Sequence, residues 1–232
     1  MRLADVPRAR RDADRVVLEG FHAVKHALRF GGELLGAWCA DPEEIEALRV
    51  RLAPDVTLAP DVVDSESLAS VVPRAQIVAV ARRPRQSPPL EATGPEPVVL
   101  LEDPRHLGNL GACVRVAAAA GAAGLLTTGR QDPWHPDALR GSAGLHFALP
   151  VARIRTLEPG DRPLVALDPD GAPGRLPPRA VVAFGTERDG LSPELLARAD
   201  QRLALPMRPG VSSLNLATAV AATLYSRRHN LP

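Results

Sequence analysis

Three segments of the chain combine glycine, small polar residues and a following helical pattern, which suits ligand binding by the backbone. The first runs through Gly108, Asn109 and Gly111 into an alanine-rich stretch that carries Arg115. Glycines let the backbone approach a ligand closely, and the start of a helix offers free N–H groups. An arginine among valines and alanines is unusual, because a buried charge needs partners. The alternative is an exposed arginine whose stem lies along the apolar surface.

The other two segments are GTERDGLS (185–192) and LPMRPGVSSLN (205–215). Taken alone, the first of these is typical of an ordinary turn between a strand and a helix. In the second, proline and glycine lead to Ser213, which we expect to cap the final helix. Asparagine is a poor helix former, so we expect the amide of Asn215 to have a separate polar role.

The elements that must position these segments alternate between strand and helix. We expect strands at 98–102, 124–127, 147–151, 164–167, 181–184 and 202–205, and helices at 109–120, 137–142, from 192 onward and at 214–228. Ser192, Pro193 and Glu194 form a strong helix start, with a cap, a proline in the first turn and an acid. The alternation predicts a mostly parallel sheet covered by helices. Such sheets bind ligands beyond the carboxyl ends of their strands.

The first part of the chain predicts a separate, smaller α/β unit. Residues 1–15 are rich in arginine and are expected to form a flexible basic arm, either solvated or in contact with RNA. Expected strands lie at 16–18, 34–40, 56–58 and 76–81, and expected helices at 21–30, 42–51 and 65–72. In the first helix, an apolar stripe of Phe21, Val24 and Leu28 opposes a polar face. That face contains the candidate RNA-binding residues His22, Lys25, His26 and Arg29.

A proline-rich stretch marks the expected domain boundary. Residues 82–97 contain five prolines and no hydrophobic periodicity, which is typical of a semi-extended linker. We therefore expect a small α/β domain at 16–81, a linker at 82–97 and the larger parallel-sheet domain at 98–232.

The bulk composition excludes several classes of protein. Of the 232 residues, 45% are hydrophobic and 24% are charged, as in ordinary soluble domains. No apolar run has the roughly 18 residues that span a membrane, and no secretory signal is evident. Two cysteines, Cys39 and Cys113, are expected to be buried thiols, and we expect a cytoplasmic protein. The histidines show no metal-ligand spacing, and a net charge of +1 says nothing about nucleic acid.

The three glycine-containing segments, taken together, resemble the signature motifs of one enzyme family. NLGACVRVAAAAG resembles the first motif of the SpoU (TrmH-like) family of SPOUT RNA 2′-O-ribose methyltransferases, FGTERDGLS its second motif, and LPMRPGVSSLNLATAVAATLY its third. The resemblance covers residues 98–229. His106, Leu107 and Gly108 replace a proline–glycine step that many relatives have before the asparagine. Residues 16–81 are similar to the small RNA-binding domain that often precedes this catalytic domain.

The resemblance implies a fold, a cofactor and partners. It implies a deep trefoil knot in the parallel-sheet domain, a homodimer, S-adenosyl-L-methionine as cofactor, and an RNA substrate. Ribosomal RNA is favoured over tRNA by analogy alone. Carried over by position, the cofactor-binding residues are Thr128, Gly129, Gly185, Glu187, Leu205, Met207, Ser213 and Leu214.

The resemblance also implies a catalytic group. The residue that matches the family's catalytic arginine is Arg115, assisted by Asn109, Ser213 and Asn215. A guanidinium keeps its proton at any ordinary pH. We therefore expect Arg115 to orient the ribose 2′-hydroxyl and bind the adjacent phosphate, rather than to act as a base.

Two alternatives belong to other functional classes. One is a catalytically inactive RNA-binding protein of the same fold, which retention of the five motif residues (Asn109, Arg115, Glu187, Ser213 and Asn215) disfavours. The other is a nucleotide-binding oxidoreductase, which the absence of a G-x-G-x-x-G fingerprint disfavours. Binding of S-adenosyl-L-methionine or of NAD by the purified protein distinguishes a methyltransferase from an oxidoreductase.

Overall fold

The chain forms two units, and one of them is discontinuous in sequence. A computed structural model describes residues 1–86, 89–186 and 189–229, with side chains to residue 227. Unit 1 contains Met1–Arg85 and Trp134–Ala148, and unit 2 contains Gln86–Pro133 and Leu149–Pro232. No helix among the described residues is long and apolar enough to cross a membrane.

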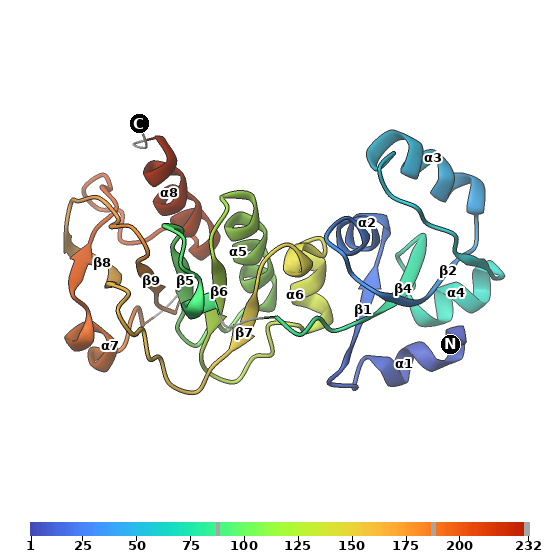
Figure 1. Cartoon of the computed structure of the whole chain (residues 1–232), viewed down its shortest axis with the longest axis horizontal. Coiled ribbons are helices and arrows are strands. Elements are labelled where there is room, and N and C mark those ends of the chain that lie inside the picture. The colour runs from blue at the N-terminus through green and yellow to red at the C-terminus, as the bar shows by residue number, and fades with distance from the viewer. Residues whose placement is uncertain (87–88, 187–188, 230–232) are drawn as a thin grey trace. The chain divides into compact units, whose positions relative to one another are not determined.

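Unit 1 is built on a four-stranded sheet with the order β1-β4-β2-β3 (Figure 1). The strands are β1 (Arg15–Glu19), β2 (Leu34–Cys39), β3 (Asp61–Val62) and β4 (Ile77–Arg82), and the helices are η1 (Leu3–Asp5), α1 (Val6–Ala9), α2 (Phe21–Arg29), α3 (Pro42–Leu52), α4 (Ser65–Val71), α6 (Pro136–Gly141) and η3 (Leu145–Phe147). Strand β4 runs antiparallel to both of its neighbours. It is buried along almost its whole length because it lies between them.

The first residues do not form the flexible arm that the sequence suggests. Val6 and Ala9, one helical turn apart in α1, are fully buried and pack in the same cluster as Trp38. Arg10 forms an ion pair of 2.8 Å with Glu19. The expectation of a mobile basic arm is therefore wrong, because a single helical turn buries two apolar side chains.

The segment Trp134–Ala148 also differs from expectation. It belongs to unit 1, although the sequence assigns it to the parallel-sheet domain. Arg140 donates to Glu19 over 2.8 Å, and the Ala143 carbonyl oxygen lies 2.7 Å from the Nδ1 atom of His26. Gly144 has φ +78°, and an added Cβ would meet the backbone of Ala23. Local periodicity cannot show such long-range contacts.

Unit 2 contains a six-stranded parallel sheet with the order β10-β8-β9-β5-β6-β7 (Figure 1). The strands are β5 (Val98–Leu101), β6 (Gly124–Thr127), β7 (Val151–Arg153), β8 (Leu164–Ala172), β9 (Val181–Phe184) and β10 (Gln201–Leu203), and the helices are η2 (Pro89–Glu91), α5 (Leu107–Ala119), α7 (Pro193–Arg198) and α8 (Leu216–His229). Helices α5 and α8 pack against each other. The expected α/β fold with a parallel sheet is confirmed.

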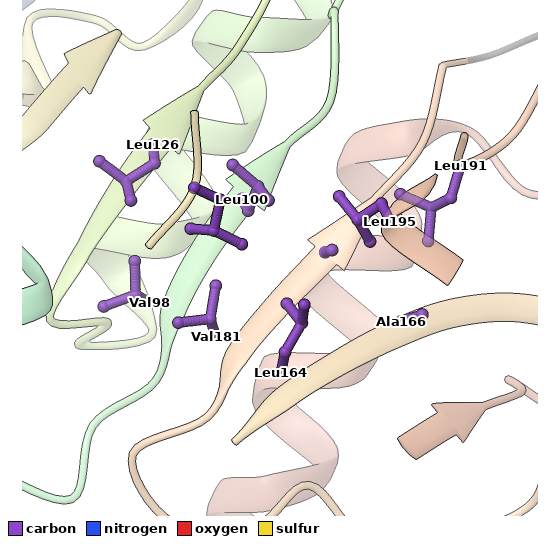
Figure 2. Packing of buried hydrophobic residues seen from close by; sticks show 10 residues of the cluster. Val98, Leu100, Leu126, Leu164, Ala166, Val181, Leu191 and Leu195 are labelled. Atoms are coloured by element: carbon purple, nitrogen blue, oxygen red, sulfur yellow. The ribbon is translucent and has the colours of Figure 1, made fainter. Parts of the chain in front are cut away.

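Apolar side chains fill the core of unit 2. Every residue of β5, β6 and β9 is buried, as expected of parallel strands covered on both faces. Figure 2 shows Val98, Leu100, Val181 and Leu195 among the ten residues of this core cluster. Both cysteines are free and buried, as expected.

The second half of the expected linker is fixed to unit 2 by a buried arginine. Arg162 is 2% exposed, and its guanidinium donates to four carbonyl oxygens, those of Leu90, Ala92, Glu96 and Arg179. Burial lowers the pKa of this guanidinium. The proline-rich segment is therefore tied to the core from about residue 90 onward.

Candidate active site

A pocket of about 450 Å³ lies beyond the carboxyl ends of three strands of unit 2. Strand β8, the loops after β9 and β10, and residues of α7 and α8 form its walls. The lining residues are Leu167, Asp168, Pro169, Phe184, Gly185, Thr186, Asp189, Gly190, Leu191, Leu196, Leu205, Met207, Ser212, Ser213, Leu214, Leu216 and Ala219. Its volume and its position are typical of a ligand site in a parallel α/β protein.

The pocket has apolar walls and two carboxylates. Leucines and Phe184 provide the apolar surface, while Asp168 and Asp189 provide negative charge. The Asp168 side chain is only 12% exposed, and its Oδ2 atom lies 2.7 Å from the Nη2 atom of Arg202. Asp189 pairs with Arg105 over 3.2 Å, and both of these side chains are exposed. The arrangement suits a ligand that has an apolar ring and a positive charge.

The loop after β9 folds tightly on itself. The backbone groups of Thr186 and Gly190 exchange hydrogen bonds of 3.0 and 3.3 Å. A Cβ at Gly185 would overlap the backbone of Gly190 and Leu191, so this position requires glycine. Glu187, an expected cofactor ligand, lies outside the described residues.

Glu102 fixes the end of this loop, and sequence reasoning missed it. Its two carboxylate oxygens accept from the backbone N–H and the hydroxyl of Ser192, both over 2.7 Å. The Ser192 hydroxyl oxygen in turn accepts from the Leu195 N–H and so caps α7, as the sequence predicts. Glu102 directly follows β5, so it connects the loops after β5 and β9.

The segment 205–215 forms the opposite wall of the pocket. Leu205, Met207, Ser213 and Leu214 all line it. Ser213 does not cap α8 as expected: Asn215 does, because its Oδ1 atom accepts from the N–H groups of residues 217 and 218 over 3.0 and 3.4 Å.

The expected catalytic residues are only partly brought together. The Nδ2 atom of Asn215 donates to the Oδ1 atom of Asn109 over 3.3 Å, which connects the start of α8 to the first turn of α5. Ser213 lines the pocket, whereas the other three do not. Arg115 is exposed on α5 and makes no hydrogen bond or ion pair within the described part of the chain. Its guanidinium is therefore available to a ligand.

Two expected cofactor residues lie elsewhere. Thr128 and Gly129 do not line the pocket. The Thr128 hydroxyl oxygen accepts from the Asp103 N–H over 3.0 Å, and a Cβ at Gly129 would overlap Asp103. They follow β6, which is separated from β9 by β5. Their expected contact with the cofactor stays a prediction.

The expected RNA-binding face of α2 is largely used within unit 1. Lys25 is only 9% exposed, and His26 is half-buried with its Nδ1 atom at the Ala143 carbonyl oxygen. Arg29 is exposed but binds both carboxylate oxygens of Asp55 over 2.7 and 2.5 Å. His22 is exposed. The expectation of one solvent-facing cationic face is thus wrong for Lys25 and His26.

The pocket contains a wall that the sequence interpretation did not include. Leu167, Asp168 and Pro169 come from β8, and Thr186 and Asp189 from the loop after β9. The signal that could have identified the first three is the polar run DPDG directly after an apolar strand. Among the described residues, no three His, Cys, Asp or Glu side chains gather as metal ligands.

A parallel sheet with a ligand pocket at its carboxyl edge, lined by two of the three glycine-containing segments, defines an α/β protein that binds a ligand of nucleotide size. The model of the SpoU rRNA Methylase family matches residues 96–225. The chain belongs to this family and is an RNA methyltransferase.

Individual relatives agree with this assignment. A 23S rRNA (adenosine(1067)-2′-O)-methyltransferase of Streptomyces laurentii is 30% identical over 99% of this chain and 92% of the relative. An uncharacterized tRNA/rRNA methyltransferase of Synechocystis is 30% identical over 95% of this chain and 86% of the relative. The crystal structure of an AdoMet-bound rRNA methyltransferase of Sinorhizobium meliloti matches with a TM-score of 0.78 and 27% identity, covering 99% of this chain and 95% of the other.

Proposed function

We propose that the chain transfers a methyl group from S-adenosyl-L-methionine to a ribose 2′-hydroxyl of RNA, with ribosomal RNA favoured over tRNA. The observation that carries the proposal is the pocket formed by the second and third motif loops. Two relatives support its details: the Streptomyces laurentii relative is named as a 23S rRNA 2′-O-methyltransferase, and the Sinorhizobium meliloti protein was crystallised with AdoMet.

The residues of the pocket fit this cofactor. Leu205, Met207 and Leu214 offer apolar surface for the adenine ring, and Gly185 keeps the loop backbone close to the pocket. Ser213 adds a hydroxyl, and the carboxylates at the pocket complement the positive charges of the cofactor. Glu187, outside the described residues, is part of the proposed site. When bound, S-adenosyl-L-methionine supplies an electrophilic methyl carbon on a cationic sulfur.

The remaining motif residues position the nucleophile. We assign to Arg115 the orientation of the ribose 2′-hydroxyl and the binding of its neighbouring phosphate, because a guanidinium matches phosphate geometry. The side-chain amides of Asn109 and Asn215 are joined by a hydrogen bond. This bond fixes the direction of their remaining polar groups. With Ser213 they orient the hydroxyl, whose oxygen bonds to the methyl carbon as the carbon–sulfur bond breaks and whose proton passes to solvent. Correct orientation of two reactants supplies much of the rate enhancement in such a reaction.

The proposal extends to the rest of the molecule. Unit 1 is proposed to bind the RNA substrate, and unit 2 to carry catalysis. We further propose that unit 2 contains a deep trefoil knot, supported by a chain path in which β8 and β10 lie at one end of the sheet while α8 returns to pack on α5. A homodimer and a cytoplasmic location complete the proposal.

Methyl transfer to ribosomal RNA tests the function directly. Purified protein and radiolabelled S-adenosyl-L-methionine are incubated with ribosomal RNA or tRNA, and 2′-O-methylated positions are then mapped. We expect transfer to a ribose of ribosomal RNA. Binding of RNA without any transfer would instead indicate the catalytically inactive protein, and transfer to a base would contradict the 2′-hydroxyl as acceptor.

A further inference from the structure

A second hollow lies at the same edge of the parallel sheet, beyond β6 and β7. It has a volume of about 600 Å³ and is lined by Gly129, Arg130, Arg153, Ile154 and Arg155. Three of its five lining residues are arginines, and all three are exposed. We call these three residues the arginine cluster. None of them belongs to the motifs that carry the proposed function.

The arginine cluster forms no ion pair with a carboxylate of the described part of the chain. Arg153 donates from Nη1 to the Arg130 carbonyl oxygen over 2.8 Å, and neither Arg130 nor Arg155 has a side-chain partner among those residues. The Asp103 carboxylate lies against Gly129 but forms no ion pair with the cluster. Many other arginines do pair with carboxylates, namely Arg10, Arg15, Arg29, Arg49, Arg82, Arg105, Arg140, Arg179 and Arg202.

We propose that the arginine cluster binds phosphate groups of the RNA substrate beside the nucleotide that is methylated. Three uncompensated positive charges around one hollow create a local positive potential that attracts polyanions. Guanidinium groups bind phosphate oxygens in pairs, through parallel N–H donors. The bond between Arg153 and the Arg130 backbone keeps two of the cluster's residues in place, so less freedom is lost on binding.

The position of the cluster agrees with this substrate. In the sheet order, β5 and its loop lie between the cofactor pocket at β9 and the cluster at β6 and β7. Neighbouring strands are about 4.8 Å apart, which places the cluster roughly 12 Å from β9 along the carboxyl edge. An RNA strand that places its ribose at the first motif, after β5, would therefore bring the phosphates of adjacent nucleotides to the cluster. The inference rests on the proposed RNA substrate and adds a site to it.

A double variant of the full chain tests the cluster. Arg130→Gln with Arg155→Gln removes two charges but keeps Arg153 and its backbone contact. The charge control, Arg175→Gln with Arg198→Gln, removes two exposed arginines of unit 2 that form no ion pair among the described residues; Arg198 does donate to the Leu157 carbonyl oxygen over 2.7 Å. Affinity for a fluorescent single-stranded RNA oligonucleotide of mixed sequence is measured against KCl concentration. Such a probe is sufficient because phosphate contacts do not depend on base sequence.

The two variants should differ in salt dependence. Each lost phosphate contact should reduce the slope of log affinity against log salt by about 0.7, so the double variant should lose about 1.4 and bind at least roughly tenfold more weakly. The control should keep the wild-type slope. Affinity for S-adenosyl-L-methionine and the melting temperature show that each variant is folded. Equal slopes for the wild type and the double variant overturn the site, and so does an equal loss in the control.

Failure of this site and failure of the proposed function give different results. If wild-type protein methylates ribosomal RNA while the double variant keeps the wild-type salt slope, only the arginine cluster is refuted. If wild-type protein transfers no methyl group to RNA, the proposed function itself fails. Methyl transfer by the wild type is therefore measured alongside the binding curves.

Discussion

Substitution of Arg115 is the most direct test of the proposed mechanism at the scale of one residue. Arg115 is exposed and unpaired within the described residues, and it follows Asn109 by less than two helical turns. If Arg115 had no role in substrate binding, its substitution would have little effect, since surface substitutions usually change the free energy of unfolding by no more than about 0.5 kcal/mol. If it orients the 2′-hydroxyl and its phosphate, Arg115→Ala should lower the rate about a thousandfold. Single-turnover transfer to RNA with saturating cofactor measures this loss.

Arg115→Lys separates charge from geometry in the same assay. Lysine keeps the positive charge but lacks the planar fork of N–H donors. We expect this variant to remain nearly inactive, while cofactor affinity is unchanged in both variants. A near-normal rate for Arg115→Ala would remove Arg115 from the proposed mechanism, and strong rescue by lysine would mean that charge alone matters.

Gly185 gives a second prediction at the scale of one residue. A Cβ at this position overlaps the backbone of Gly190 and Leu191, so Gly185→Ala must displace the loop that lines the pocket. We expect affinity for S-adenosyl-L-methionine to fall at least about tenfold, which corresponds to about 1.4 kcal/mol. Titration calorimetry measures it.

Gly108→Ala is the matched control for this change. A Cβ at Gly108 meets no atom within 4 Å, and alanine favours the helix in which this residue lies. This variant should bind cofactor as the wild type does. Unchanged affinity in Gly185→Ala would show that the loop after β9 does not hold the cofactor.

The role of an individual residue could be predicted from the sequence where it depends on interactions within the same turn or helix. Ser192 caps α7 because its hydroxyl needs only the next turn of the helix. The capping of α8 by Asn215 instead of Ser213 depends on where the chain leaves the pocket wall and on the contact with Asn109. The position of Thr128 and Gly129 beside Asp103 is set by strand order, which local sequence does not show.

At the scale of elements, strands and helices whose sequences show a strong hydrophobic periodicity lie close to their expected bounds. Those with a weak periodicity do not. The strand expected at 56–58 is absent, and β3 forms instead at Asp61–Val62, where it pairs with Trp38 and Cys39 of β2. The strand expected at 147–151 is replaced by η3 and by β7, which begins at Val151. A two-residue strand is defined by its partner, which periodicity cannot identify.

The contact between α2 and the loop after α6 predicts a pH dependence. Burial of His26 lowers its pKa below the ordinary value of 6.5, although its bond to the Ala143 carbonyl oxygen acts in the opposite direction. Below pH 6.5, the unfolded state therefore binds more protons at this site than the folded state. The free energy of unfolding should decrease as the pH falls through 6.5 towards the lower pKa of the folded protein.

Replacement of this histidine isolates its contribution. Urea unfolding of wild type and His26→Gln, compared between about pH 7 and pH 5, measures it. Glutamine can still donate to the Ala143 carbonyl oxygen but does not titrate, so the variant should lose less stability on acidification. The same loss in both proteins would show that other groups cause it.

At the scale of the whole molecule, the sequence predicted two parts but not their composition. The first change of unit, between residues 85 and 86, falls within the proline-rich stretch. Trp134–Ala148 was assigned to the wrong part because its contacts with Glu19 and His26 join residues more than a hundred positions apart. Residues 90–96, expected in a linker, are instead held by the side chain of Arg162.

This last contact predicts where unit 2 can be cut. We expect a fragment of residues 86–232 to bind S-adenosyl-L-methionine, because every described residue of the pocket lies within it. A fragment of residues 95–232 lacks Leu90 and Ala92, whose carbonyl oxygens accept from Arg162. Leaving a buried cation partly unsatisfied costs on the order of 2–3 kcal/mol, so this shorter fragment should unfold at lower urea concentration.

Calorimetry of cofactor binding and urea unfolding of both fragments distinguish the outcomes, with the full chain as reference. The shorter fragment with Arg162→Met is the control, since it removes the charge that has lost two of its four carbonyl partners. It should regain part of the stability that the cut at residue 95 removes. Equal stability of the two fragments would show that Arg162 does not need the carbonyl groups of residues 90 and 92. Cofactor binding by the full chain alone, with a folded 86–232 fragment that does not bind, would show that cofactor binding requires residues 1–85.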